Sequence, residues 1–221
     1  MTTKNLYLAL LKNRRMLISE LSAITGLTED IVKSKLRDLV GLVKTTELEV
    51  ILEKPLDLAL LLIKEGFSIR DISKYVDWRD FEKVSAEILG SHGYVVITNF
   101  TLTRPVRLEI DVVGVDVGSG RSILVDCKHW SKGISRKALV EAIDKHVARI
   151  EKLLKYFGRA RSKWKYFKYV KEVIPLIVTL TTPPLRFYRN TVAVSIQELN
   201  QLLLDLPLVI DTFGIKPYRA F

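Results

Sequence analysis

Residues 108–130 read LEIDVVGVDVGSGRSILVDCKHW, and this stretch decides how the second half of the chain folds. Two apolar runs flank the segment GSGR at residues 118–121, whose glycines supply the backbone freedom that a tight reversal needs. The pattern predicts a hairpin of two largely buried strands. Charged residues nevertheless interrupt the apolar runs at Asp111, Asp126 and Lys128. Their placement in the hairpin determines whether they are solvated surface or a chemical site.

The register of the hairpin sets which charges lie together. With Val117 paired to Ser122, Asp111 lies opposite Lys128, and Asp126 is a diagonal neighbour of Asp111. Side chains alternate along a strand, so one face collects the charges. The residues on that face are Glu109, Asp111, Asp126 and Lys128. A slip of one residue would separate the set.

Two neighbouring carboxylates in an apolar setting repel each other and are costly to bury unless a cation lies between them. Mg²⁺ suits that position because it prefers oxygen ligands, keeps several waters and bridges to phosphate oxygens. Lys128 beside the ion would orient or deprotonate a water, or neutralise charge on a reacting phosphate. An ordinary salt bridge between Asp111 and Lys128 is the alternative. Asp116 falls on the opposite face and stays outside the set.

Helical and extended patterns alternate around the hairpin. From residue 78 the order is helix, three strands, helix, two strands and helix. A nearly continuous apolar run at residues 173–180 indicates a strand covered on both faces. Ser135 is expected to cap a long helix, and Ser195 with Glu198 to form a capping box. The pattern therefore predicts an α/β domain.

This order of elements, with I-D at residues 110–111 in the second strand and D-C-K at residues 126–128 in the third, resembles the PD-(D/E)xK nuclease superfamily. The likeness covers about residues 78–200 and points to the Mrr-type restriction endonucleases and the archaeal Holliday-junction resolvases. The resemblance implies a restriction-endonuclease-like core, in which a mixed central sheet is flanked by helices. It also implies a metal-dependent DNA endonuclease of a restriction or repair and recombination type.

The resemblance carries over residue by residue to the motif positions. In the family a glutamate near the start of the first core helix joins the metal site, and Phe81-Glu82 before Gly93-Tyr94 matches that pattern. Glu87 competes with Glu82 but lies on a different face of the helix. The implied catalytic residues are Glu82, Asp111, Asp126 and Lys128. The implied metal ligands are Asp111, Asp126, the backbone carbonyl of Cys127 and, directly or through water, Glu82.

The resemblance also implies partners. The expected cofactor is Mg²⁺, with Mn²⁺ as a substitute, and the expected substrate is DNA. Cleaving both strands of a duplex or junction generally needs two active sites, so a homodimer is expected. The sequence leaves open whether the substrate is a specific site, a methylated site, a branched structure or a strand end.

The N-terminal third reads as a separate, mainly helical module. Apolar residues recur at helical spacing between residues 18 and 40 and are interrupted at Gly26, which predicts two helices joined by a tight turn. Residues 42–52 then alternate as a two-stranded wing. The arrangement resembles a winged helix-turn-helix domain, in which the second helix enters the DNA major groove. A protein-interaction or spacer role is the alternative. The predicted domains are a winged-helix-like domain at residues 1–66, a connecting helix at 67–77 and a nuclease domain at 78–221.

The net charge of +10 suggests an acidic partner. Residues 149–171 hold nine basic residues against the single acid Glu151, with aromatic residues between them. This composition suits phosphate contacts, although a solvated basic helix whose aromatic side chains face the core explains it equally well. The candidate DNA-contacting residues are Lys33, Lys35 and Arg37 in the N-terminal module, and Lys145, Arg149, Arg159, Arg161, Lys163 and Lys165 in the C-terminal part.

Several classes of protein are disfavoured by composition. No charge-free run of about 18 apolar residues occurs, so no membrane span is expected. The single cysteine cannot form an internal disulfide, and a cytoplasmic setting is the default. Few glutamines and many Lys and Glu give a weak thermophile signature. The alternative to an enzyme is a DNA-binding regulator or architectural protein whose nuclease-like core does not cut. An RNA nuclease that relies on metal-free acid-base groups is disfavoured by the scarcity of histidines.

Overall fold

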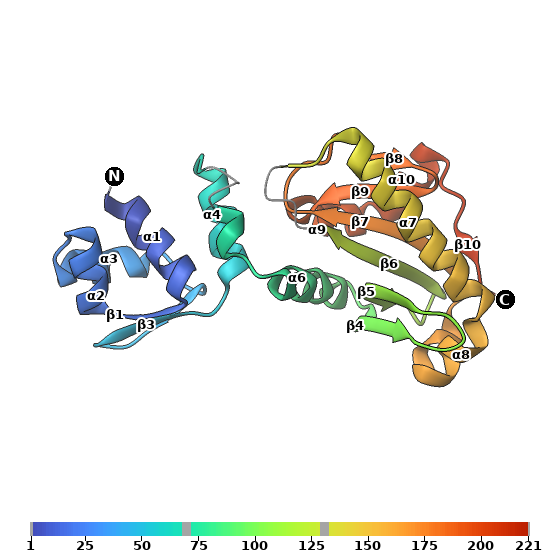
Figure 1. The fold of residues 1–221 in the computed structure, drawn as a ribbon, viewed down its shortest axis with the longest axis horizontal. Coiled ribbons are helices and arrows are strands. Elements are labelled where there is room, and N and C mark those ends of the chain that lie inside the picture. Colours follow the sequence, from blue (N-terminus) through green and yellow to red (C-terminus); the bar gives the residue numbers. More distant parts are fainter. Residues whose placement is uncertain (1, 68–71, 129–132, 221) are drawn as a thin grey trace. The chain divides into compact units, whose positions relative to one another are not determined.

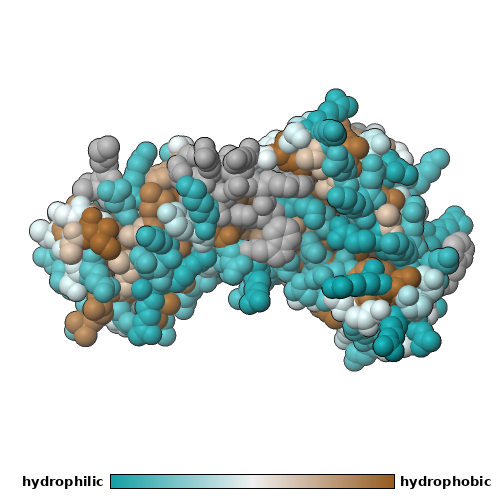
Figure 2. Space-filling view, in the orientation of Figure 1, coloured by the Kyte–Doolittle hydropathy of each residue, from teal (hydrophilic) through white to brown (hydrophobic). Residues whose placement is uncertain are grey.

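The computed structural model describes residues 2–67, 72–128 and 133–220. The chain divides into two compact units, Met1–Asp80 and Phe81–Phe221. None of the described helices is long and apolar enough to cross a membrane. Figure 2 shows one face of the molecule, on which hydrophilic residues predominate and hydrophobic areas are smaller.

The first unit contains helices and a small antiparallel sheet (Figure 1). Its elements are α1 (Thr2–Asn13), β1 (Arg15–Leu17), α2 (Ile18–Thr25), α3 (Glu29–Arg37), β2 (Val43–Thr45), β3 (Glu49–Leu52), α4 (Pro55–Lys64) and η1 (Ser73–Tyr75). The strand order is β1-β3-β2, and Leu10, Leu21 and Leu36 form part of its buried core. The predicted helix pair and wing are therefore present. Residues 68–71 of the predicted connecting helix lie outside the described residues.

The second unit is built on a mixed sheet of seven strands, in which the order is β4-β5-β6-β7-β9-β8 and β10 pairs with β7. Its elements are α6 (Trp78–Ser91), β4 (Val95–Leu102), β5 (Leu108–Val115), β6 (Arg121–Lys128), α7 (Arg136–Lys155), α8 (Phe157–Lys163), η2 (Lys165–Tyr169), β7 (Glu172–Thr179), β8 (Phe187–Tyr188), β9 (Thr191–Ser195), α9 (Ile196–Leu204), α10 (Leu206–Phe213) and β10 (Tyr218–Arg219). Strands β4, β5 and β6 are antiparallel neighbours, whereas β6, β7 and β9 run parallel.

Helices cover both faces of this sheet. On one face α7 runs along the strands (Figure 1), and its Ile143 packs with Ile177 and Ala193 of β7 and β9. On the other face the Sγ atom of Cys127 lies 3.6 Å from the hydroxyl of Ser85 on α6, and α9 follows β9. The predicted mixed sheet flanked by helices is confirmed.

The two predicted helix starts have the expected chemistry. The hydroxyl of Ser135 accepts a hydrogen bond of 3.2 Å from the backbone N–H of Ala138 at the start of α7. Ser195 and Glu198 form the capping box of α9, in which the Glu198 carboxylate accepts from the backbone N–H of Ser195 at 2.9 Å. Both caps satisfy N–H groups that the first helical turn leaves without partners.

The predicted register of the β5–β6 hairpin is wrong by two residues. Ser122 pairs with Val115 rather than Val117, and the ladder continues to the pair Val112 and Val125. Extending this register places Asp111 at the level of Asp126 instead of Lys128. Because the shift is an even number of residues, it does not exchange the faces of the two strands. The grouping of charges therefore survives, although the partner of Asp111 changes.

The turn explains the shift. The carboxylate of Asp116 accepts hydrogen bonds from the backbone N–H of Gly118 at 2.9 Å and from the hydroxyl of Ser119 at 2.5 Å. The N–H of Asp116 donates to the carbonyl of Arg121 at 2.9 Å, and Gly120 takes a left-handed backbone with φ +78°. Side-chain closure by Asp116 thus ends the strand earlier than the glycine pattern alone predicted.

Candidate active site

The β5–β6 hairpin opens at the end away from its turn. Beyond its last pair, Val112 with Val125, the carboxylate of Asp111 reaches toward β6. Its Oδ2 atom accepts a hydrogen bond of 2.7 Å from the backbone N–H of Cys127. The Asp111 side chain thereby takes the place of a backbone carbonyl of β5 as the acceptor for the Cys127 N–H. The opening creates the space in which the acidic residues of β5 and β6 meet.

Strand β4 is irregular at the same level. Its pairing with β5 skips one position, which is the level of Asn99 and Asp111. Asn99 has φ +52°, a left-handed conformation that asparagine tolerates better than most residues. Asp111 therefore lies at an interruption of the ladder on both sides of its strand. Sequence periodicity gave no sign of this interruption.

Asp111 is a buried carboxyl group with an unfavourable charge. Its residue is 8% exposed. Burial raises the pKa of Asp111 to about 7, and the charges of Asp126 and Glu82 act in the same direction. The Cys127 hydrogen bond and the charge of Lys128 oppose this rise without cancelling it. A cation beside Asp111 would relieve the cost of ionising it.

Asp126 has the opposite electrostatic environment. It is 1% exposed, and Arg149 Nη2 donates to its Oδ1 atom at 2.7 Å. Lys128 Nζ lies 2.7 Å from Oδ2 as an ion pair, although Oδ2 has no hydrogen bond of good alignment. Burial alone would raise the pKa of Asp126, but interactions with His146, which is charged only in its protonated form, and with the cations Lys128 and Arg149 lower it below the ordinary value. Asp126 is therefore an ionised carboxylate held between two cations.

Glu82 lies on the side of α6 that faces the sheet. Its neighbours Phe81 and Ser85 are fully buried, and Glu82 itself is only 4% exposed. The negative charge of Glu82 is the smallest of the causes that raise the pKa of Asp111. Glu87, the competing glutamate, is exposed to solvent. The helix thus presents Glu82 rather than Glu87 toward the acidic residues of the hairpin.

The residues at the opening offer an oxygen-rich donor set. Among the residues that the structure describes, no three His, Cys, Asp or Glu side chains gather as a complete metal cage. Mg²⁺ does not require one, because one or two carboxylates with waters and phosphate oxygens commonly hold it. Asp111 and Asp126 supply the carboxylates. The carbonyl of Cys127 points to the same side of β6 as its N–H, as both groups of an extended residue do. These donors fit a hard divalent cation.

Two residues of α7 near Asp126 have roles that the sequence did not reveal. His146 is fully buried, its Nε2 atom lies 2.9 Å from the carbonyl of Leu124, and burial lowers its pKa to about 4. It is therefore a neutral structural residue near neutral pH. Arg149, one of the predicted DNA-contacting residues, donates to Asp126 in this structure. In the sequence, the only sign of a shared role was that His146 and Arg149 are three residues apart and therefore lie on one face of the helix. This spacing does not tell which strand the face packs against.

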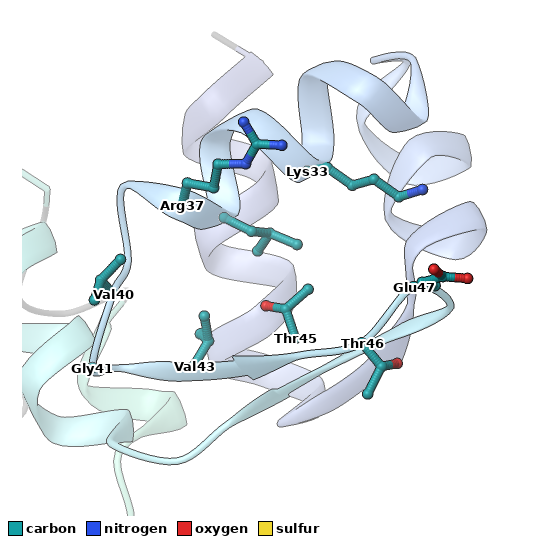
Figure 3. Close-up of a pocket in the computed structure, with 9 residues that line it drawn as sticks. Lys33, Arg37, Val40, Gly41, Val43, Thr45, Thr46 and Glu47 are labelled. Atoms are coloured by element: carbon teal, nitrogen blue, oxygen red, sulfur yellow. The ribbon is translucent and has the colours of Figure 1, made fainter.

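In the first unit, part of the predicted DNA-contacting set lines a pocket between α3 and the wing. Figure 3 shows Lys33 and Arg37 on α3, with Val43 and Thr45 on the strand across from them. Lys35 instead lies 3.6 Å from Asp38 on the same helix. The pocket thus combines two cations with the threonines of the wing and one acid, Glu47, so its lining has a small excess of positive charge.

In the second unit the predicted cations surround an aromatic core. Phe157 and Phe167 are buried and meet Phe100 of β4, so these rings stabilise the fold. Lys163 Nζ donates to the carbonyl of Thr101 at 2.5 Å, which ties α8 to β4. The remaining cations of this set are exposed at the surface of the second unit. They are Arg159, Arg161 and Lys165, with Lys145 exposed on α7.

Comparison with known proteins agrees with this arrangement. Residues 73–152 match a family model, Mrr_cat, described as a restriction endonuclease, and the matched segment contains Glu82, Asp111 and Asp126. No match was found among curated proteins.

Two solved structures are similar at low levels. Protein VC1899 from Vibrio cholerae is 12% identical with a TM-score of 0.35, and the alignment covers 97% of this chain and 54% of that one. AF1548, titled a protein of unknown function, is 15% identical with a TM-score of 0.31, over 61% of this chain and 66% of that one. The chain thus spans about half the length of the first of these proteins. With its mixed sheet and the match over residues 73–152, the second unit has a restriction-endonuclease-like core, consistent with the PD-(D/E)xK superfamily.

Proposed function

We propose that the chain is a Mg²⁺-dependent DNA endonuclease whose active site is the open end of the β5–β6 hairpin. The observation that carries the proposal is the pairing of two buried carboxylates with opposite electrostatics. Asp111 has a pKa of about 7, whereas the pKa of Asp126 lies below its ordinary value. This arrangement accommodates a divalent cation at Asp111 while Asp126 stays ionised.

Each site residue has a distinct task in phosphodiester hydrolysis. Asp111, Asp126 and the Cys127 carbonyl would hold the cation, with Glu82 contributing directly or through water. When bound, Mg²⁺ supplies Lewis acidity and makes water a better nucleophile. Lys128, fixed by its ion pair with Asp126, orients the attacking water and stabilises charge on the phosphate.

The DNA contacts belong to the same proposal. Cations that can contact DNA phosphates are present in both units. They are Lys33 and Arg37 in the pocket between α3 and the wing, and Arg159 and Arg161 on the surface of the second unit. We propose a homodimer because cleavage of both strands needs two sites. A cytoplasmic location and the use of Mn²⁺ in place of Mg²⁺ complete the proposal.

The test is Mg²⁺-dependent cleavage of linear, supercoiled and four-way-junction DNA by wild type and Asp111→Ala. We expect the wild type to cut at least one of these substrates in Mg²⁺ or Mn²⁺ and to be inactive in EDTA. Asp111→Ala should lose the activity while keeping a cooperative unfolding transition. Undiminished cleavage by a folded Asp111→Ala protein would refute the assignment. Sedimentation of the wild type with and without DNA measures the oligomeric state.

A second candidate function is a DNA-binding protein that does not cut. The observation that favours it is the engagement of Asp126 by both Lys128 and Arg149, which also describes a structural ion cluster. Such a protein binds DNA with strong salt dependence and no need of metal. Titrating Mg²⁺ into DNA-binding and cleavage assays at several salt concentrations separates the two functions.

A further inference from the structure

Arg149 makes one short contact and two long ones. Its Nη2 atom donates to Asp126 Oδ1 at 2.7 Å. Its Nη1 and Nε atoms lie 3.4 Å from the carbonyls of Glu109 and Lys145, distances at which hydrogen bonds are weak. Its side chain is 26% exposed, so the guanidinium lies at the border between the buried acid and solvent. Asp126 is therefore the principal partner of a side chain that solvent can reach.

The Arg149 contact places a positive charge on Asp126 Oδ1, an oxygen that a metal ion would bind. Arg149 bonds Oδ1 of Asp126, and Lys128 forms an ion pair with Oδ2. Each carboxylate oxygen has two lone pairs, so a divalent cation can approach Asp126, but it meets the repulsion of the positive charge that it has to share an oxygen with. Release of one of these two partners therefore favours metal binding. Lys128 is carried by the same strand as Asp126 and lies two residues away, so it stays close in any case. Arg149 comes from a separate element, α7, through a long and flexible side chain, and its release requires no change in β6.

We propose that Arg149 is a positioning residue that competes with the divalent cation for Asp126 Oδ1 and moves to a DNA phosphate when cation and DNA bind. The inference rests on the nuclease function proposed above and adds a form of regulation to that site. A guanidinium presents five N–H donors in a planar fork that suits carboxylate and phosphate oxygens alike. Arg149 thus weakens metal binding in the DNA-free protein and couples metal loading to the arrival of substrate.

The experiment compares wild type with Arg149→Met, which keeps a flexible side chain and removes the charged fork. Mn²⁺ alone is titrated into the DNA-free, full-length protein, and free Mn²⁺ is measured by electron paramagnetic resonance. We expect the variant to bind Mn²⁺ roughly tenfold more tightly, a change of about 1.4 kcal/mol. Its affinity for duplex DNA at saturating Mn²⁺, measured before cleavage proceeds, should fall by a similar factor. Unchanged Mn²⁺ affinity or unchanged DNA affinity in the folded variant overturns the proposal.

The chain offers a matched control in an arginine–aspartate pair whose aspartate lies on the same helix. Arg189 Nη1 lies 2.7 Å from Asp144 Oδ1 of α7, which is an arginine–aspartate pair of equal length in an exposed setting. Arg189→Met should leave both affinities at wild-type values. Thermal unfolding of each variant checks the fold. Should Arg149→Met fail to fold, Arg149→Lys provides the test, because lysine keeps the charge but lacks the planar fork. We expect Arg149→Lys to bind Mn²⁺ more tightly than wild type, by less than the tenfold expected for Arg149→Met. Mn²⁺ affinity of Arg149→Lys at or below that of wild type would then overturn the proposal.

Failure of this inference is distinguishable from failure of the proposed function. If only the inference fails, cleavage still depends on Asp111, while Arg149→Met binds Mn²⁺ as wild type does. If the nuclease function fails, wild type does not cut and Asp111→Ala has no effect on any DNA substrate.

Discussion

The two ends of the β5–β6 hairpin each carry an aspartate, and the protein treats their charges in opposite ways. At the turn, the hydroxyl of Ser119 donates to Asp116 and, with backbone N–H groups, lowers its pKa. At the open end, burial raises the pKa of Asp111 to about 7, against a single backbone hydrogen bond from Cys127. A carboxylate with several hydrogen-bond donors at the surface of the turn is thus stable as a charged structural group, whereas a buried carboxylate with one donor carries a charge that a cation can stabilise.

The largest expected effect is a difference in DNA cleavage between substitutions of Asp111 and of Asp116. Asp111→Asn keeps the shape and a hydrogen-bond acceptor but removes the charge that would bind the cation. We expect Mg²⁺-dependent cleavage to fall by about 100-fold or more, beyond the usual cost of losing an outer-sphere partner. Asp116→Asn should cut at close to the wild-type rate. Initial rates on the best substrate measure both, and equal losses in the two variants would remove the distinction between the two ends.

Metal-linked stability gives the next effect. A cation that binds only the folded protein raises its free energy of unfolding, by about 2.7 kcal/mol at a concentration 100 times the dissociation constant. We expect added Mg²⁺ to raise the melting temperature of wild type and Asp116→Asn but not that of Asp111→Asn. Calcium-free buffers with and without EDTA provide the baseline. A similar rise in all three proteins would place the bound ion elsewhere.

The pH dependence of stability tests the charge at Asp111 without any metal. Its pKa rises from 3.8 in the unfolded chain to about 7 in the fold. The folded state therefore holds this proton more tightly, and the resulting stability is full below about pH 4 and is lost as the pH rises to about 7.

Asp111→Asn cannot titrate, so the comparison isolates this group. In EDTA, we expect the variant to become more stable relative to wild type as the pH rises from about 4 to about 8. The pKa of His146, lowered to about 4, acts with the opposite sign, but both proteins share it. Urea unfolding across this pH range measures the difference. A difference that does not change with pH would contradict the raised pKa.

The smallest effect concerns the turn. Asp116→Ala removes the acceptor for the Gly118 N–H and the Ser119 hydroxyl. We expect a loss of about 1 kcal/mol in the free energy of unfolding, the usual contribution of such hydrogen bonds. Activity should follow wild type once the protein is folded. Denaturant unfolding at neutral pH measures the loss, and a strong drop in cleavage by a stable variant would link the turn to the site.

Much of the fold was predictable because local chemistry specifies it. Alternating apolar runs, the glycines of the turn and the capping serines Ser135 and Ser195 act over a few residues, and the structure bears them out. The hairpin register was not predictable to the residue. The register depends on the hydrogen bonds that the Asp116 carboxylate accepts from Gly118 and Ser119. These bonds select one turn among several glycine-containing turns of nearly equal length.

The candidate site was only partly predictable. Motif spacing led to Asp111, Asp126 and Lys128, because these residues belong to one hairpin. Arg149 was assigned to a general basic surface, since a helical pattern gives the face of α7 but not the strand residue beneath it. Of the aromatic residues that lie between the cations, Phe167 belongs to the core, which agrees with the alternative of a basic segment whose aromatic side chains face inward. Long-range packing decides such roles, and local sequence does not encode it directly.

The most direct test of the central claim is the position of a bound cation. A crystal of the full-length protein soaked in Mn²⁺ locates the ion by its anomalous scattering. We expect a peak bonded to both Asp111 and Asp126 and close to the Cys127 carbonyl, with the Arg149 guanidinium displaced from Asp126. A peak elsewhere, or no peak while the Arg149–Asp126 contact persists, would contradict a metal-dependent nuclease site at the open end of the hairpin.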